Sequence, residues 1–258
     1  MRKSSGSKKC EVWTFSNHKG GVGKTSSAVN IGAALGRAGK RVLVIDMDPQ
    51  ANLSLSLGAQ NATQHIYGCL SGEYGMASAT IPVMENVKIV PSTIDLSGAE
   101  IELSSEAGRE VILRELIEEV KEEYDYILID CPPSLGLLTI NALTATDKVL
   151  VPLQAEYLPT QGLTKLFEVV KKIKKRLNKE IEIGGVFVTR FDARKVLNRE
   201  VVASIEKALG NIVLKTRIRD NIALAEAPQK GLDIFRYDPR SNGAIDYHAL
   251  GEELMKRQ

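Results

Sequence analysis

Short, nearly continuous apolar runs recur along the chain and predict buried strands. The clearest are `EVWTF` (11–15), `RVLVID` (41–46), `VKIVP` (87–91), `YILID` (126–130), `KVLVP` (148–152) and `GGVFVT` (184–189), with `NIVLKT` (211–216) as a weaker candidate. A strand that is apolar at successive positions is typical of a parallel sheet covered by other elements on both faces.

Apolar residues recur at helical spacing between several of these strands. The pattern predicts helices over 25–39, 108–124 and 163–179, whereas residues 53–86 are the least regular part, with short helices at most. Strands that alternate with helices predict an α/β fold, with a doubly wound, mostly parallel sheet flanked by helices. We expect one domain over residues 10–258, preceded by a flexible basic tail over residues 1–9.

Composition limits the possible partners. Lys and Arg total 34 against 32 for Asp and Glu, so the net charge is only +2, and any contact with nucleic acid must come from a local basic patch. No apolar run approaches the roughly 20 residues of a membrane-spanning helix. The three cysteines show no CxxC spacing, which indicates reduced thiols and a cytoplasmic protein.

The segment `SNHKGGVGKTSS` (16–27) lies between the first predicted strand and the first predicted helix. Glycines in this context let backbone N–H groups converge on phosphate oxygens, and the N-terminus of the helix adds a favourable dipole. Lys24 would reach the β- and γ-phosphates, and the Thr25 hydroxyl would bind Mg²⁺. The usual phosphate-loop motif requires glycine at position 18, where this chain has His18.

The segment `KGGVGKT` resembles the phosphate loop of the deviant Walker A ATPases, a family that includes the partition proteins ParA and Soj and the division-site protein MinD. The resemblance extends from residue 11 to about residue 255 and implies a P-loop NTPase fold. It implies that Lys19 reaches the γ-phosphate of the other subunit's nucleotide in a homodimer that sandwiches ATP. A solvated surface lysine is the alternative. The ATP-binding residues expected from the resemblance are Lys19, Gly20, Gly21, Val22, Gly23, Lys24, Thr25, Ser26, Asn221 and Pro228.

Carboxylates follow two of the predicted strands. In `VLVIDMDPQAN` (42–52), the resemblance implies that Asp48 positions or activates the attacking water, while Asp46 supports the loop and the surroundings of the metal. The alternative is that either side chain caps the following turn. In `YILIDCPPS` (126–134), Asp130 resembles a Walker B aspartate that holds Mg²⁺ through water. The expected catalytic residues are Lys19, Lys24 and Asp48, and the expected metal-site residues are Thr25 and Asp130.

Two later segments, `VFVTRFDARK` (186–195) and `IRDNIALAEAPQKG` (218–231), resemble the family's adenine and dimer segments. They place Asn221 and Pro228 near the base, although Arg219-Asp220 stands where the family usually has a proline-arginine pair. Arg194 matches a family arginine implicated in DNA contact, and we expect Lys195, Arg199 and Arg219 to assist it. A row of lysines over 165–179 could also contact DNA or could be only a solvated helix face.

These observations predict a cytoplasmic, nucleoid-associated ATPase that uses ATP and Mg²⁺. As a homodimer it would bind double-stranded DNA non-specifically, and a ParB-like centromere-binding protein or a cargo adaptor would stimulate slow hydrolysis. That activity would segregate a plasmid, chromosome or mobile element. The C-terminal stretch `AIDYHALGEELMKRQ` is interpreted as a packing helix, so no membrane partner is expected. An ATP-switched regulatory DNA-binding protein and a ParA-like positioner of a protein cargo remain the alternatives.

Overall fold

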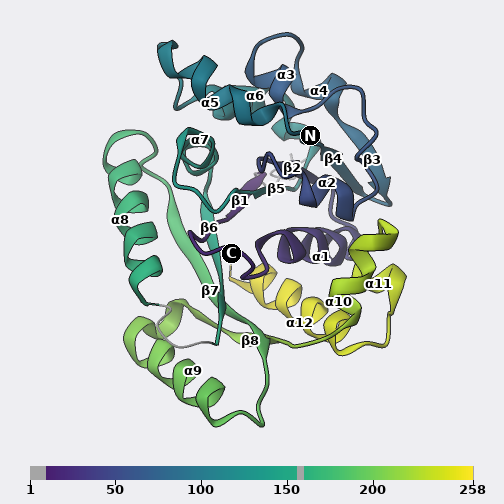
Figure 1. The fold of residues 1–258 in the computed structure, drawn as a ribbon, viewed down its shortest axis with the longest axis vertical. Coiled ribbons are helices and arrows are strands. Elements are labelled where there is room, and N and C mark those ends of the chain that lie inside the picture. Colours follow the sequence, from purple (N-terminus) through teal and green to yellow (C-terminus); the bar gives the residue numbers. More distant parts are fainter. Residues whose placement is uncertain (1–9, 156–159, 258) are drawn as a thin grey trace, which may run out of the picture.

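A computed structural model describes residues 10–155 and 160–257, and within these ranges eight strands form one sheet (Figure 1). Their order is β3-β4-β2-β5-β1-β6-β7-β8, and every neighbouring pair is parallel except the antiparallel β3 and β4. The strands are β1 (Glu11–Phe15), β2 (Val42–Asp46), β3 (Ile81–Met84), β4 (Val87–Val90), β5 (Tyr126–Asp130), β6 (Lys148–Gln154), β7 (Glu182–Phe191) and β8 (Val213–Arg219). The predicted α/β class is confirmed.

Helices cover both faces of this sheet, with α1 and α12 on one side and α5 to α9 on the other (Figure 1). The α-helices are α1 (Lys24–Arg37), α2 (Asn52–Ser56), α3 (Ile66–Leu70), α4 (Met76–Ala79), α5 (Leu96–Glu102), α6 (Ile112–Val120), α7 (Leu137–Thr144), α8 (Thr160–Arg176), α9 (Val196–Leu209), α10 (Ala223–Glu226), α11 (Ile234–Tyr237) and α12 (Asn242–Lys256).

The buried strands are apolar at successive positions because each residue faces one of two cores. In β5, Leu128 packs into the core beneath α1 and α12, whereas Ile127 and Ile129 pack into the core beneath α5, α6 and α7. All three side chains have no exposed surface. Helix α1 lies close to the sheet because it is built from small residues; a β-carbon at Gly36 would lie 2.6 Å from Val87 Cγ2. The buried strands are therefore apolar at successive positions because helices cover both faces of the sheet.

The structure corrects the predicted elements in two places. Residues 81–84 form the edge strand β3, which the prediction of irregular structure with short helices missed. This strand is short, half-buried and contains Pro82, a residue that is tolerated in a sheet only at edges and bulges. The helix predicted over 108–124 begins only at Ile112, after Gly108 adopts a φ of +76°. The weaker strand candidate is confirmed as β8, shifted toward the C-terminus, and the predicted tail lies outside the described residues.

Strand β1 lies between β5 and β6, so the chain crosses from one side of β1 to the other when β5 connects to β6. In open parallel sheets, ligands bind at the carboxyl ends of the strands where the winding direction reverses. The loop between β1 and α1 begins at this point. The topology therefore places the glycine-rich loop where a nucleotide site is expected.

We expect Leu250→Ala to lower the free energy of unfolding by about 2 to 5 kcal/mol, because Leu250 in α12 is fully buried against the sheet and its removal leaves a cavity. Ile245→Ala in the same helix is the matched control, since Ile245 is 55% exposed. Urea unfolding measures both changes. Equal effects of the two substitutions would contradict the packing role of α12.

Candidate functional site

The loop between β1 and α1 has a backbone that only glycine adopts easily. Gly21 and Gly23 have φ angles of +73° and +90°, in the left-handed region. Gly23 precedes the first residue of α1, and no side chain caps this end of the helix. The first N–H groups of α1 are therefore oriented toward a ligand at the loop, which suits an anion such as a phosphate.

Polar side chains at the ends of β6 and β7 hold this loop in place. The Gln154 amide donates a hydrogen bond to the carbonyl oxygen of Gly21 at 2.6 Å, and the Thr189 hydroxyl donates to that of Val22 at 2.8 Å. The Asn17 amide donates to the carbonyl oxygen of Pro152 at 2.8 Å. Sequence reasoning missed these three residues, although a polar residue at the end of an apolar strand is the signal that could have identified Gln154 and Thr189.

The two predicted lysines lie in different environments. Lys24 is 7% exposed, and its Nζ donates a hydrogen bond to the carbonyl oxygen of Lys19 at 3.3 Å. Burial lowers the pKa of Lys24, and the neighbouring charges of Asp130 and Asp48 act in the opposite direction. Lys19 itself is exposed at the surface of the loop. The chain therefore has one lysine inside the site and one at its outer edge.

Asp130 and Thr25 form the part of the site that fits a magnesium ion. The Thr25 hydroxyl donates to Asp130 Oδ2 at 2.6 Å, and the buried Oδ1 of Asp130 has no hydrogen-bond partner. Burial raises the pKa of Asp130 well above its usual range, and the charge of Asp46 raises it further. A cation would stabilise the ionised form. These hard oxygen atoms fit Mg²⁺, which commonly combines one or two protein ligands with phosphate oxygens and water.

The protein alone does not supply a complete metal cage in the described ranges, where no group of three or more His, Cys, Asp or Glu could hold a metal ion. This agrees with a site in which phosphates supply the remaining ligands. The neighbouring Cys131 is fully buried, and burial raises the pKa of its thiol. Cys131 is therefore a packing residue and not a reactive one.

Asp46 and Asp48 lie beside the pair formed by Thr25 and Asp130. Asp46 ends β2 directly opposite Asp130 in the register of the sheet, and it is fully buried. Burial raises the pKa of Asp46 to about 6, against the effect of the hydrogen bonds it accepts from Ser54. Asp48 is 8% exposed and accepts a hydrogen bond from the backbone N–H of Gln50 at 3.0 Å. The structure thus brings Lys24, Asp48 and Asp130 close enough for their charges to act on one another.

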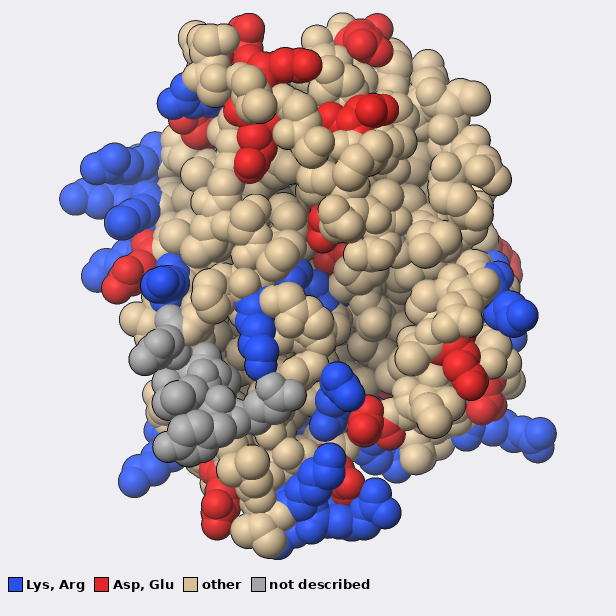
Figure 2. Space-filling model, viewed as in Figure 1, with Lys and Arg blue, Asp and Glu red and all other residues tan. Residues whose placement is uncertain are grey.

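A cavity of about 610 Å³ adjoins the glycine loop on the side of β7 and β8. Gly21, Gly23 and Ser26 line one wall, and Asn221 lines the other, where an adenine base was predicted. Pro228 lies in the 3-10 helix η4 (Ala227–Lys230) and is not among the lining residues. Figure 2 shows basic and acidic side chains meeting in a recess near the middle of the face of the molecule that it draws.

The residues predicted to bind DNA fall into two places. Arg194, Lys195 and Arg199 are all exposed where β7 leads into α9. The Arg194 guanidinium bonds to both carboxylate oxygens of Asp192, at 3.0 and 2.9 Å, and lowers the pKa of Asp192 to about 2. Arg219 instead lines the cavity and forms an ion pair of 2.7 Å with Asp246. Arg219 thus shares a cavity with Asn221, which was predicted to lie near the base, whereas Arg194 is not among the residues that line this cavity.

The lysine row seen in the sequence lies on the outer face of α8. Its exposed members on this helix are Lys165, Lys171, Lys172, Lys174, Lys175 and Arg176, and Lys179 is exposed just beyond the end of the helix. Figure 2 shows Lys and Arg side chains projecting from the left edge of the molecule, where Figure 1 places α8. The charge pattern of this helix therefore produces an exposed basic surface.

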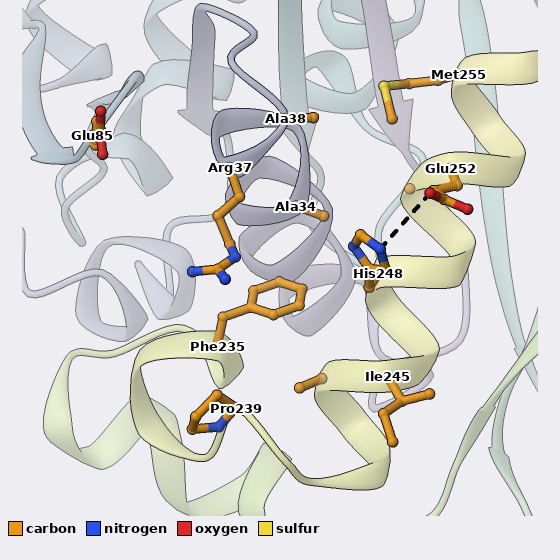
Figure 3. A pocket seen from close by; sticks show the side chains of 12 residues that line it. Ala34, Arg37, Ala38, Glu85, Phe235, Pro239, Ile245, His248, Glu252 and Met255 are labelled. Carbon is orange, nitrogen blue, oxygen red and sulfur yellow. Dashed lines mark ion pairs between the residues drawn. The ribbon is translucent and has the colours of Figure 1, made fainter.

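A second cavity of about 610 Å³ lies between the C-terminal half of α1, α11 and α12 (Figure 3). Arg37 stands over the ring of Phe235 at 5.3 Å, and His248 faces Glu252 at 3.8 Å across one turn of α12. None of its lining residues belongs to the glycine loop. This second cavity is therefore separate from the glycine loop, where the sequence predicts the nucleotide site.

We expect Asp130→Ala to weaken Mg²⁺-dependent nucleotide binding by roughly 10- to 100-fold, because the variant loses a carboxylate that orients the metal and its water. Binding measured in EDTA should change little. Asp125→Ala is the matched control, since Asp125 precedes the same strand but pairs with Arg41. Titration of a fluorescent ATP analogue with and without Mg²⁺ checks this. An unchanged Mg²⁺ effect in Asp130→Ala would exclude Asp130 from the metal site.

Comparison with known proteins places the chain in a family. A model of the AAA domain family matches residues 10–183. The chain is 46% identical to the chromosome-partitioning ATPase Soj of Treponema pallidum, over 94% of this chain and 96% of that protein. It is also 46% identical to the sporulation initiation inhibitor protein Soj of Bacillus subtilis, over 95% and 98% of the two chains.

Among solved structures, cobyrinic acid a,c-diamide synthase from Mycobacterium smegmatis, with an ATP analogue and magnesium bound, has a TM-score of 0.85 and 32% identity. The match covers 96% of this chain and 95% of that one. Within residues 10–155 and 160–257, no helix is both long and apolar enough to cross a membrane. The chain belongs to the ParA/Soj family of chromosome-partitioning ATPases.

Proposed function

We propose that residues 10–258 form one ATPase domain that dimerises around two Mg·ATP and binds DNA non-specifically in that state. With a centromere-binding partner, it would segregate a plasmid, chromosome or mobile element. The observation that carries this proposal is the 46% identity, over nearly the whole chain, to a chromosome-partitioning ATPase. That extent includes the glycine loop, both carboxylate-bearing strand ends and the segment around Asn221.

The nucleotide part of the proposal rests on the chemistry of the site. The uncapped start of α1 and the buried Lys24 suit a triphosphate, while Thr25 and Asp130 suit its magnesium ion. Magnesium would neutralise charge on the phosphates. The M. smegmatis protein of similar fold holds an ATP analogue and magnesium, which supports the same ligands here.

Hydrolysis needs a positioned water and a cation for the charge that develops on the γ-phosphate. Asp48 would position the water, because its carboxylate lies beside Lys24 and Asp130 in the same recess. Lys19 would supply the cation to the partner subunit's nucleotide, because it is exposed at the outer edge of the loop. Hydrolysis would then be slow until two subunits meet, and a partner protein would stimulate it.

DNA binding would use the exposed basic residues at the start of α9. Arg194, Lys195 and Arg199 lie together, and such side chains bind phosphates without reading the sequence. A local patch is required because the net charge of the chain is only +2. These residues, together with the basic face of α8, would associate the protein with the nucleoid.

A regulatory role is the second candidate, because the B. subtilis relative is named as an inhibitor of sporulation initiation. In that case the ATP state would control gene expression and not the movement of DNA. Transport of a protein cargo through an adaptor is the third. Preference for one operator over random DNA would favour the regulatory role.

We expect Lys19→Ala to bind ATP normally but to lose about 10²-fold or more in hydrolysis, because the cation supplied across the dimer is removed. The wild-type rate per subunit should rise with protein concentration, whereas the rate of the variant should not. Lys256→Ala serves as the control, since Lys256 is exposed at the far end of α12. Should Lys19→Ala hydrolyse ATP at the wild-type rate, the shared-site mechanism is wrong.

We expect the ATP-bound protein to bind random duplex DNA with an affinity that falls steeply with salt. Arg194→Ala should weaken binding and reduce the slope of log affinity against log salt by about one unit, because one phosphate contact is lost. Arg240→Ala, at another exposed arginine, should leave the slope unchanged. Fluorescence anisotropy with ATP and with ADP measures this. Equal binding in the two nucleotide states would contradict the proposal.

A further inference from the structure

A chain of buried hydrogen bonds connects the loop that carries Asp48 to two other segments. Asp46 Oδ1 accepts a hydrogen bond from the backbone N–H of Asp48 at 3.1 Å. Asp46 Oδ2 accepts two from Ser54, at 2.9 Å from the backbone N–H and at 2.7 Å from the hydroxyl. Both oxygens of one carboxylate thus fix the start and the end of the segment from 46 to 54.

The Ser54 hydroxyl also accepts a hydrogen bond. The backbone N–H of Ser92, just beyond the end of β4, donates to Ser54 Oγ at 2.8 Å. Ser54 is fully buried and Ser92 is 3% exposed, so water does not readily replace either partner. One hydroxyl therefore joins the end of β2, the short helix α2 and the segment that leads from β4 to α5.

This arrangement bears on the position of Asp48. Asp46 lies opposite Asp130 in the sheet, and two neighbouring carboxylates repel each other. The Ser54 hydroxyl holds Asp46 by a charge-assisted hydrogen bond, which is stronger than a neutral one. Without the hydroxyl, Asp46 would keep only the backbone donors, and its carboxylate could turn. The backbone of Asp48, held by the other oxygen of that carboxylate, would then shift.

We propose that Ser54 is a positioning residue for ATP hydrolysis, which holds Asp46 and thereby fixes the loop that presents Asp48 to the attacking water. The inference rests on the proposed role of Asp48. Ser54 need not touch the nucleotide in this scheme. Its hydroxyl sets the geometry of a catalytic group through one intermediate carboxylate.

Helix α2 offers a matched control. Ser56 is 6% exposed and lies in the same helix, but its hydroxyl donates only to the carbonyl oxygen of Asn52, at 2.6 Å. Ser56→Ala therefore removes a buried hydroxyl from the same helix without changing Asp46. A purely structural role of buried serines in α2 would make the two alanine variants behave alike.

The experiment measures single-turnover hydrolysis by the full chain at saturating Mg·ATP, along with the affinity for a fluorescent ATP analogue and the Tm. We expect Ser54→Ala to slow hydrolysis by roughly 10- to 100-fold, because a small misplacement of a catalytic group is costly. Nucleotide affinity should stay near the wild-type value. Ser54→Thr, which keeps the hydroxyl, should recover most of the rate, and Ser56→Ala should match the wild type.

Three results would overturn the inference: wild-type hydrolysis by Ser54→Ala, equal losses in Ser54→Ala and Ser56→Ala, or no recovery in Ser54→Thr. Should Ser54→Ala fail to fold, Ser54→Cys is judged by the same criteria, because a thiol is a weak hydrogen-bonding group of similar size. Asp48→Ala is measured in parallel. Normal hydrolysis by Asp48→Ala would refute the proposed role of Asp48. If Asp48→Ala loses hydrolysis while Ser54→Ala hydrolyses ATP at the wild-type rate, only the inference about Ser54 is refuted.

Discussion

The site depends on two carboxylates that are buried side by side at the ends of neighbouring strands. Asp46 and Asp130 are partners in the register of β2 and β5, and neither has exposed surface. Removing charged groups from water is costly unless they are paired or hydrogen-bonded. The protein offsets this cost differently for each: Ser54 and the backbone of Asp48 bond to Asp46, whereas Asp130 keeps one oxygen without a partner.

This difference between Asp46 and Asp130 explains how the carboxyl ends of β2 and β5 can hold one fixed group and one group suited to a ligand. The environment of Asp46 is complete within the chain, so this side of the site is fixed by folding. Burial raises the pKa of Asp130 and lowers the pKa of Lys24, so it disfavours the charged form of each. A ligand that supplies the opposite charge would stabilise those charged forms. A magnesium ion and a triphosphate together would provide those charges. The site therefore combines a fixed frame around Asp46 with two groups, Asp130 and Lys24, whose charges the proposed Mg·ATP would balance.

Much of the fold and of the candidate site could be predicted from the sequence, because strong local patterns agree with the fold. Runs such as `YILID` are apolar at every position since both faces of the sheet are covered, and Asp130 breaks the run at the strand end where ligands bind. Strand β3 could not be predicted in this way, because a four-residue edge strand with three half-buried residues and an exposed proline has no such contrast. The roles of Gln154, Thr189 and Ser54 depend on contacts between distant segments. A polar residue at the end of an apolar strand marks Gln154 and Thr189 as candidates, but no local pattern indicates which backbone groups they bond.

Strand β3 also limits how copies of the protein can associate. It lies at one end of the sheet, runs antiparallel to β4, and has a bulge between Pro82 and Met84. Proline lacks the N–H that an incoming strand would need, and a bulge disturbs the regular spacing of backbone groups. Growth of a continuous intermolecular sheet from this side, as in fibrous aggregates, is therefore disfavoured. This edge of the sheet is therefore protected against irreversible aggregation even where many copies of the protein are crowded together.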